Sequence, residues 1–150
     1  MGFHLSKRSL SRLAGVDEDL VEVVKYAITV TKIDFGVTCG VRTVAEQKAL
    51  VASGASQTMN SKHLEGRAVD LVAYIGPRVS WELNLYDDIG DAMREGAKVV
   101  GADLLWGAAW HIPDVRFWDG TMEDAMNSYI DLRRSQGKRP FIDAVHWELN

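Results

Sequence analysis

Cysteine is nearly absent from this chain of 150 residues, which has a single one, Cys39. An intrachain disulfide is therefore impossible, and a zinc cluster of several thiolates or a Cys-x-x-Cys redox site is excluded as well. At this length folding can bury roughly 70% of the surface that the unfolded chain exposes, so a core can form without disulfides. Any bound metal must therefore use histidine and carboxylate ligands.

An excess of positive charge is also lacking, because 17 basic and 21 acidic residues give a formal net charge of −4. This balance argues against a protein whose main partner is nucleic acid. No stretch of 18 uncharged apolar residues occurs, and no signal-peptide core follows the basic residues near the amino terminus. We therefore expect that the chain is synthesised in the cytoplasm and does not insert stably into a membrane.

Internal repeats, low-complexity tracts and linkers rich in proline or serine are absent, and the chain has only 3 prolines. We therefore predict a single domain over residues 1–150. Apolar periodicity and capping residues predict helices at 17–31, 43–53, 85–100 and 121–134, and strands at 34–39, 68–75, 103–106 and 145–149. Because helices and strands do not alternate strictly, the pattern favours an α+β fold.

The segment S-K-H-L-E-G-R-A-V-D places His63 at the end of a polar loop and Asp70 inside an apolar strand. A carboxylate at such a position is costly to bury unless it is paired or binds a metal. A metal ligand is one interpretation of Asp70. An ion pair with Arg67 or Arg42 is the other, and this segment by itself favours neither.

The second segment, F-I-D-A-V-H-W-E-L, places Asp143 three residues before His146. Residues three apart on a regular strand face opposite sides, so both can reach one site only if Asp143 lies in a bend before the strand. Taken alone, the segment is more typical of a half-buried edge strand with an ordinary hydrogen-bonded histidine.

Together, His63, Asp70 and His146 supply two imidazoles and one carboxylate. Three such ligands leave a fourth tetrahedral position open, which is the pattern of catalytic zinc sites. A carboxylate that does not bind the metal, Asp143, could then act as the base, with Glu65 and Glu148 as rival candidates. These residue types predict hydrolysis of an amide bond.

The same two segments resemble the motifs of a family of zinc peptidases. The first matches Ser-x-His-x-x-Gly-x-Ala-x-Asp, and D-A-V-H-W-E-L matches the terminal acid-x-x-His strand, of the peptidases that include D-alanyl-D-alanine carboxypeptidases and phage L-alanyl-D-glutamate endopeptidases. The segments L-S-K-R-S-L-S-R-L, V-R-T-V-A-E-Q and L-W-G-A-A-W resemble the phage endolysin branch. The resemblance therefore covers most of the chain.

This resemblance implies a Hedgehog/D,D-peptidase-type fold, a small antiparallel sheet with packed helices. It implies that His63, Asp70 and His146 hold one Zn²⁺ ion and that Asp143 is the catalytic base. Arg42 and Gln47 would then face the substrate.

Further candidate residues have two interpretations each. Arg42 could clamp a substrate carboxylate or pair with a nearby aspartate, and Ser61 could contact substrate or cap its loop. Four tryptophans either line a cleft or pack in the core: Trp106, Trp110, Trp118 and Trp147. The chain departs from the family pattern at Cys39, where an acidic residue is expected, and at Ala108, where a second glycine is expected.

The implied activity is that of an endolysin that cleaves the peptidoglycan stem peptide between L-alanine and D-glutamate during host lysis. Its implied properties are a monomeric state, no separate wall-binding domain, and access to the cell wall through a membrane lesion made by a holin-type protein. Two alternatives stay open, a D,D-carboxypeptidase or dipeptidase with the same metal site and a non-catalytic zinc-binding module.

Overall fold

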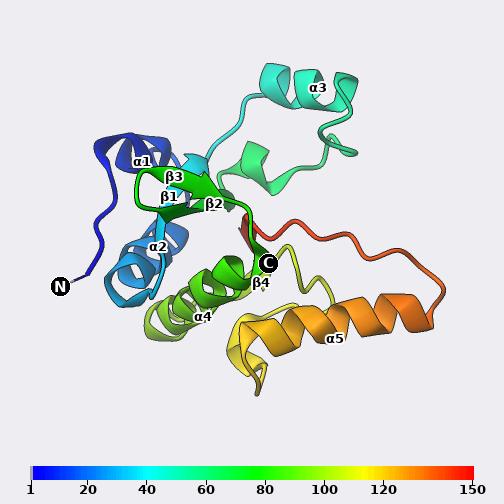
Figure 1. Ribbon diagram of the computed structural model, residues 1–150. Helices are drawn as coiled ribbons and strands as arrows, with labels where there is room; N and C mark the ends of the chain where they lie inside the picture. The colour runs from blue at the N-terminus through cyan, green and yellow to red at the C-terminus, as the bar shows by residue number, and fades with distance from the viewer. Residues whose placement is uncertain (1) are drawn as a thin grey trace.

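A computed structural model describes residues 2–150 (Figure 1). Its helices are α1 (Lys7–Arg12), α2 (Glu18–Val30), α3 (Val44–Ala52), α4 (Leu83–Val100) and α5 (Met122–Ser135), with short 3₁₀ helices η1 (Lys62–Glu65) and η2 (Val115–Phe117). Its strands are β1 (Asp34–Cys39), β2 (Ala68–Ile75), β3 (Arg78–Ser80), β4 (Leu104–Trp106) and β5 (His146–Leu149). The predicted α+β class is confirmed.

The strands form one antiparallel sheet in the order β1-β2-β5-β4, and β3 pairs with β2. The two central strands, β2 and β5, come from distant parts of the chain. Their register places Asp70 directly opposite His146. Cross-strand partners point to the same face of a sheet, so this register alone brings two candidate ligands together.

One face of the sheet carries the hydrophobic core. Val69, Leu71 and Ala73 of β2 are fully buried in the same cluster as residues of α2 and α4, and these two helices lie side by side (Figure 1). Because side chains alternate along a strand, Asp70 between Val69 and Leu71 points to the opposite face. The apolar residues of β2 therefore fix the direction of the one carboxylate among them.

The predicted helices and strands are all present, with boundaries within a few residues. Four short elements in residues 2–150 were not predicted: the helix α1, the strand β3 and the 3₁₀ helices η1 and η2. Helix α1 covers the outer edge of β1, where the Ser9 hydroxyl accepts a hydrogen bond from Val37 N at 3.0 Å and Arg12 donates to Val37 O at 3.0 Å. These contacts satisfy backbone groups that an edge strand otherwise exposes.

Asp87 of α4 gives a prediction about stability. The residue is 6% exposed, and its Oδ1 has no hydrogen-bond partner among residues 2–150. Burial, together with the nearby carboxylates of Glu123, Asp88 and Asp91, raises its pKa to about 6. Between roughly pH 4 and 6 the folded chain thus holds a proton that the unfolded chain has lost, so the free energy of unfolding falls as the pH rises through this window.

We therefore expect Asp87→Asn to stabilise the protein at pH 7 by at most about 3 kcal/mol. The variant should also lack the decrease in the free energy of unfolding that Asp87 causes between pH 4 and 6. Urea unfolding at several pH values measures both effects. Asp131→Asn, at an exposed position of α5, removes the same charge and serves as the control. An Asp87→Asn variant whose stability relative to wild type does not change with pH would contradict the prediction.

Candidate active site

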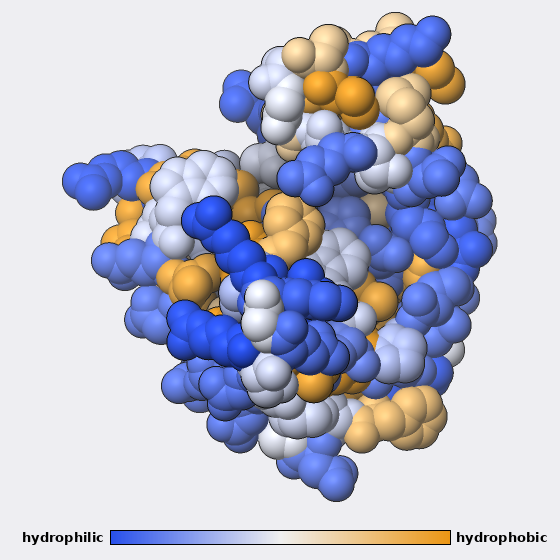
Figure 2. All heavy atoms as spheres, turned by 90° about the vertical axis from the view of Figure 1, so that its right-hand side faces the viewer, coloured by the Kyte–Doolittle hydropathy of each residue, from blue (hydrophilic) through white to orange (hydrophobic). Residues whose placement is uncertain are grey.

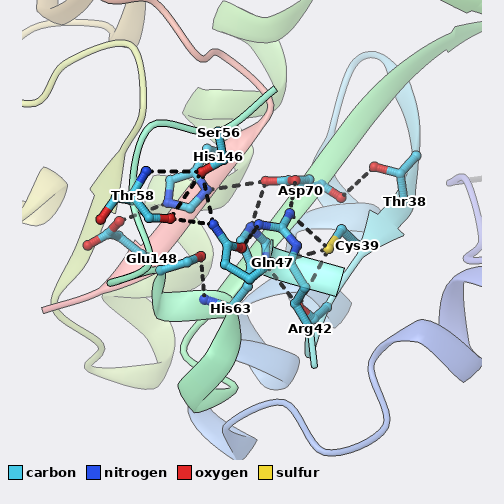
Figure 3. A network of polar contacts seen from close by, with 12 residues as sticks. Thr38, Cys39, Arg42, Gln47, Ser56, Thr58, His63, Asp70, His146 and Glu148 are labelled. Atoms are coloured by element: carbon cyan, nitrogen blue, oxygen red, sulfur yellow. Dashed lines mark hydrogen bonds and ion pairs between the residues drawn. The ribbon is translucent and has the colours of Figure 1, made fainter. Parts of the chain in front are cut away.

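Three side chains converge on the face of the sheet opposite the core (Figure 3). His63 Nε2 and His146 Nδ1 each lie 3.2 Å from the same oxygen, Oδ1 of Asp70. His63 comes from η1, whose first turn is capped by the Ser61 hydroxyl and whose end is Gly66 in the left-handed conformation, with φ 70°. A non-glycine residue rarely adopts this φ, so Gly66 allows the chain to turn from η1 into β2.

A second hydrogen bond fixes the orientation of each imidazole. Nδ1 of His63 donates to the backbone oxygen of Gly40 at 2.8 Å, and Nε2 of His146 donates to Glu148 at 2.8 Å. Because an oxygen acceptor needs a hydrogen on the nitrogen it faces, the other nitrogen of each neutral ring presents a lone pair to Asp70. Such outer partners are typical of histidines that bind metals.

The three inward-facing atoms are therefore all electron-pair donors, two imidazole nitrogens and a carboxylate oxygen. They can lie this close only with positive charge between them, supplied by protons or by a metal cation. The donor set of two nitrogens and one oxygen suits Zn²⁺. The residues at this site thus fit a zinc ion, with Glu148 and the Gly40 backbone oxygen as the outer partners.

The pKa values of these groups show the same preference for positive charge. Burial alone would raise the pKa of Asp70, but the hydrogen bonds from His146 and His63 hold it well below its usual range. Burial would lower the pKa of both histidines, but their acidic partners together outweigh it. Asp70 and Cys39 raise the pKa of His63 to about 10, and Asp70 and Glu148 raise that of His146 to about 9.

Cys39 provides a second possible set of ligands. Cys39, His63 and Asp70 place ligand atoms within 4.8 Å of one another, so this group could hold a metal ion. However, Cys39 Sγ lies 3.6 Å from Nδ1 of His63, the nitrogen that bonds Gly40. Arg42 Nη2 is 3.4 Å from this sulfur and 3.7 Å from Asp70 Oδ2, so a guanidinium cation already bridges the two. Cys39 and Asp70 thus already share a cationic partner on this side of the site.

Asp143 lies in the bend before β5, as expected from the sequence. Its backbone oxygen accepts from His146 N at 3.1 Å, and its backbone N–H donates to Gly107 O at 2.8 Å. A Cβ at position 107 would lie 2.2 Å from Asp143 O, so this close approach requires glycine. Burial and the nearby Asp70 raise the pKa of the Asp143 carboxyl. Such a shift suits a group that must both accept and donate a proton.

Gln47 links Arg42 to the loop before η1. It is fully buried, and it is the one buried residue of α3. Its Oε1 accepts from Arg42 Nη1 at 2.7 Å, and its Nε2 donates to Ser56 Oγ at 2.9 Å and to Thr58 O at 2.6 Å (Figure 3). Helix α3 is therefore held to the rest of the site by the hydrogen bonds of this polar side chain and not by a face of buried apolar residues.

A cavity of about 740 Å³ contains the metal-binding candidates. Helix α3 stands apart from the other helices in Figure 1, and Figure 2 shows the surface hollowed below this lobe. The lining includes Arg42, Ser61, Lys62, His63, Asp70, Trp110, Phe141, Asp143, His146 and Glu148. Cationic, acidic and aromatic groups thus surround one open site that is large enough for a short peptide.

Comparison with known proteins identifies the family of this chain. The family model described as phage L-alanyl-D-glutamate peptidase matches residues 1–149. The chain belongs to this peptidase family. The L-alanyl-D-glutamate peptidase of Escherichia phage T5 is 32% identical over 115 residues, which cover 74% of this chain and 84% of that protein.

Two further members of the family support the assignment. The L-alanyl-D-glutamate peptidase of Listeria phage A118 is 43% identical over 70 residues, or 47% of this chain and 24% of that protein. The crystal structure of the Serratia marcescens L-Ala D-Glu endopeptidase ChiX has a TM-score of 0.71 and 31% identity, covering 98% of this chain and 90% of that one. The fold that the motifs implied is therefore confirmed for this peptidase.

The structure brings most of the predicted site residues of this peptidase to one cavity. Ser61 caps η1 and also lines the cavity, whereas Gln47 lies behind Arg42 and outside the lining. Arg42 pairs with Asp70, one of the two alternatives that the sequence left open. Glu65 is exposed and away from the cavity, so it is no longer a rival base on geometric grounds.

Several features of the site were not anticipated. Glu148 holds His146, a role that its spacing of two residues on one strand could have indicated. Of the tryptophans, Trp106 and Trp147 are stacked in the core, while Trp110 lines the cavity next to Phe141. The sequence left these two interpretations open because a tryptophan pattern does not separate core from cleft.

Proposed function

We propose that this chain is a zinc-dependent endopeptidase that hydrolyses the L-alanyl-D-glutamate bond of the peptidoglycan stem peptide. The observation that carries the proposal is the convergence of His63, Asp70 and His146, whose facing atoms are all electron-pair donors. The names of the family and of its phage members support the choice of bond.

Metal binding and proton transfer are assigned to different residues of the proposed site. A zinc ion bound by the two histidines and Asp70 would polarise the scissile carbonyl and acidify water. Asp143 takes the proton of the attacking water and later delivers it to the leaving amine of D-glutamate. Gly107 allows the close approach that holds the Asp143 backbone in the bend before β5, and Asp143 lines the same cavity as the candidate metal ligands.

Arg42 would position the substrate. Its guanidinium lines the cavity, and a stem peptide carries the free α-carboxylate of D-glutamate, which suits a bidentate arginine contact. Gln47 holds Arg42 from behind through the bond to Nη1. Gln47 therefore acts on substrate through Arg42.

We expect Gln47→Leu to raise KM by about tenfold with a smaller fall in kcat, because Arg42 loses its fixed orientation while Asp143 and the metal ligands are untouched. Steady-state kinetics on a soluble stem peptide measures the split. Gln136→Leu, the same change at an exposed position after α5, is the control. A pure loss of kcat in Gln47→Leu would contradict a positioning role.

Product analysis tests the proposed function most directly. Purified cell walls are digested and the soluble products are identified by mass spectrometry. New D-glutamyl amino termini are the expected result. Release of terminal D-alanine would instead identify a D,D-carboxypeptidase, and zinc binding without any product would identify a non-catalytic module.

The biological setting of the proposal is host lysis by a phage or prophage. We propose that the chain is made in the host cytoplasm as a monomeric single domain and reaches the cell wall after a holin-type protein permeabilises the membrane. The phage origin of the two curated peptidases supports this setting. Within residues 2–150, no helix has the length and apolar character needed to span a membrane.

A further inference from the structure

Two aromatic side chains form a ledge beside the candidate metal site. The Trp110 ring stacks on His146 with centroids 5.7 Å apart, and the Phe141 ring stacks on Trp110 at 6.0 Å. Trp110 Nε1 donates to the backbone oxygen of Phe141 at 3.0 Å, which ties the two residues together. We call Trp110 and Phe141 the aromatic ledge.

The aromatic ledge is open to solvent and belongs to the cavity. Both residues line it, and Phe141 is 54% exposed. Phe141 lies in the segment between α5 and β5, where Trp110 holds its backbone in place. An exposed aromatic ring that is already oriented loses little conformational freedom when a ligand covers it. The ledge is thus suited to bind a flat apolar surface.

A row of contacts that passes through the candidate metal ligands links Arg42 to the aromatic ledge. Arg42 contacts Asp70, Asp70 contacts His146, and His146 stacks on Trp110. Phe141 follows at the far end of this row. A peptide that crosses the metal site therefore has a cationic group at one end and an aromatic surface at the other.

The stem peptide has matching ends around the proposed bond. On the carboxyl side, D-glutamate carries its free α-carboxylate. On the amino side, a single L-alanine separates the bond from the lactyl group of muramic acid, so a sugar ring follows almost at once. If Arg42 takes the carboxylate, the sugar is directed to the opposite end of the cavity. Sugar rings present an apolar C–H face and no charge, which is the chemistry that an aromatic ring binds.

We propose that the aromatic ledge is a subsite for the muramic acid ring, and that it makes the enzyme prefer stem peptides still attached to glycan. This proposal rests on the proposed function, because it takes the bond between L-alanine and D-glutamate as the one that is cleaved. The ledge recognises the sugar on the amino side of the bond, whereas Arg42 recognises the peptide on the carboxyl side.

The test compares two soluble substrates that differ only in the sugar. One is N-acetylmuramoyl-L-alanyl-γ-D-glutamyl-L-lysine, and the other has an N-lactoyl group in place of the N-acetylmuramoyl group, so that neither has a free amino terminus at alanine. The measured quantity is the ratio of kcat/KM for the sugar-bearing substrate to that for the sugar-free substrate. We expect wild type to prefer the sugar-bearing substrate by about fivefold or more.

Variants of Phe141 then assign the preference to the ledge. Phe141→Ala and Phe141→Leu should bring the ratio close to one, because leucine is apolar but has no flat ring. Phe141→Tyr should retain the wild-type ratio. Phe117→Ala removes a ring that is 79% exposed on η2 and outside the cavity lining, and it should leave the ratio unchanged.

The outcomes separate this proposal from the proposed function. Hydrolysis of neither substrate by the zinc-loaded wild type would overturn the proposed function. Hydrolysis of both substrates with equal kcat/KM, or an unchanged ratio in Phe141→Ala, would overturn the sugar subsite and leave the proposed function standing. A Phe141 variant whose kcat/KM falls equally for both substrates keeps the wild-type ratio between them, and this result would also contradict the subsite.

Discussion

Asp143→Ala is expected to lower kcat for stem-peptide hydrolysis by about 10²- to 10⁴-fold, the usual contribution of a general base. The carboxylate lines the cavity without a bond to any of the three candidate metal ligands. Its removal should therefore leave the metal in place. Kinetics on a soluble substrate and metal analysis of the same purified sample measure the two effects together.

Two comparisons sharpen the Asp143 prediction. Glu65→Ala removes an exposed acid of η1 and should leave both zinc and activity unchanged. Glu148→Gln alters the acceptor that holds His146, so it should weaken zinc affinity by about 10- to 100-fold. Full activity in Asp143→Ala would exclude this residue as the base, and full zinc binding with no activity in Glu148→Gln would make Glu148 the base instead.

Replacing either histidine of the candidate zinc site is expected to remove both the metal and the activity. His63→Ala or His146→Ala leaves two protein ligands where a catalytic zinc needs three. Purified variants should contain less than about one tenth of the wild-type zinc under the same conditions, because the site has lost one ligand. Chelation of wild type should likewise abolish hydrolysis and lower the melting temperature, because zinc binds the folded state.

His111 and Cys39 provide the matched controls for the metal site. His111 bonds Ser128 away from the cavity, so His111→Ala should keep its zinc. Cys39→Ser distinguishes the two possible ligand sets. It should retain zinc if His63, Asp70 and His146 are the ligands, and it should lose zinc if Cys39, His63 and Asp70 are. Zinc retained in His146→Ala but lost in Cys39→Ser would overturn the proposed site.

The main helices and strands could be predicted from the sequence because each is marked by residues within or next to it. The capping box of Thr43 and Glu46 marks the start of α3, and both of its hydrogen bonds are present. The apolar run of β2 and the glycine after α4 mark their elements in the same way. In contrast, α1 has only six residues, and its tertiary contacts with the edge of β1 support it. Short helices of this kind have little signal of their own.

The candidate metal ligands were predicted from spacing and motif, but their geometry was not. Residue spacing along the chain does not predict that β2 and β5 are neighbouring strands or that Asp70 pairs with His146 in their register. Nor can it distinguish a Gln47 that faces substrate from one that is fully buried behind Arg42. Burial depends on how α3 sits over the 56–58 loop, and side-chain type alone does not determine this.

The sequence by itself determined which chemistry is available to this protein. One cysteine excludes a site of several thiolates and leaves imidazole and carboxylate as the main available ligands, and the two motifs select His63, Asp70 and His146. Only the tertiary structure decided how these residues face one another and what surrounds them. The register of β2 and β5 brings His146 beside Asp70, the backbone of Gly40 holds His63, and loop residues place the aromatic ledge next to His146 and Arg42 next to Asp70. These contacts join residues far apart in the chain, so they exist only once the sheet has formed.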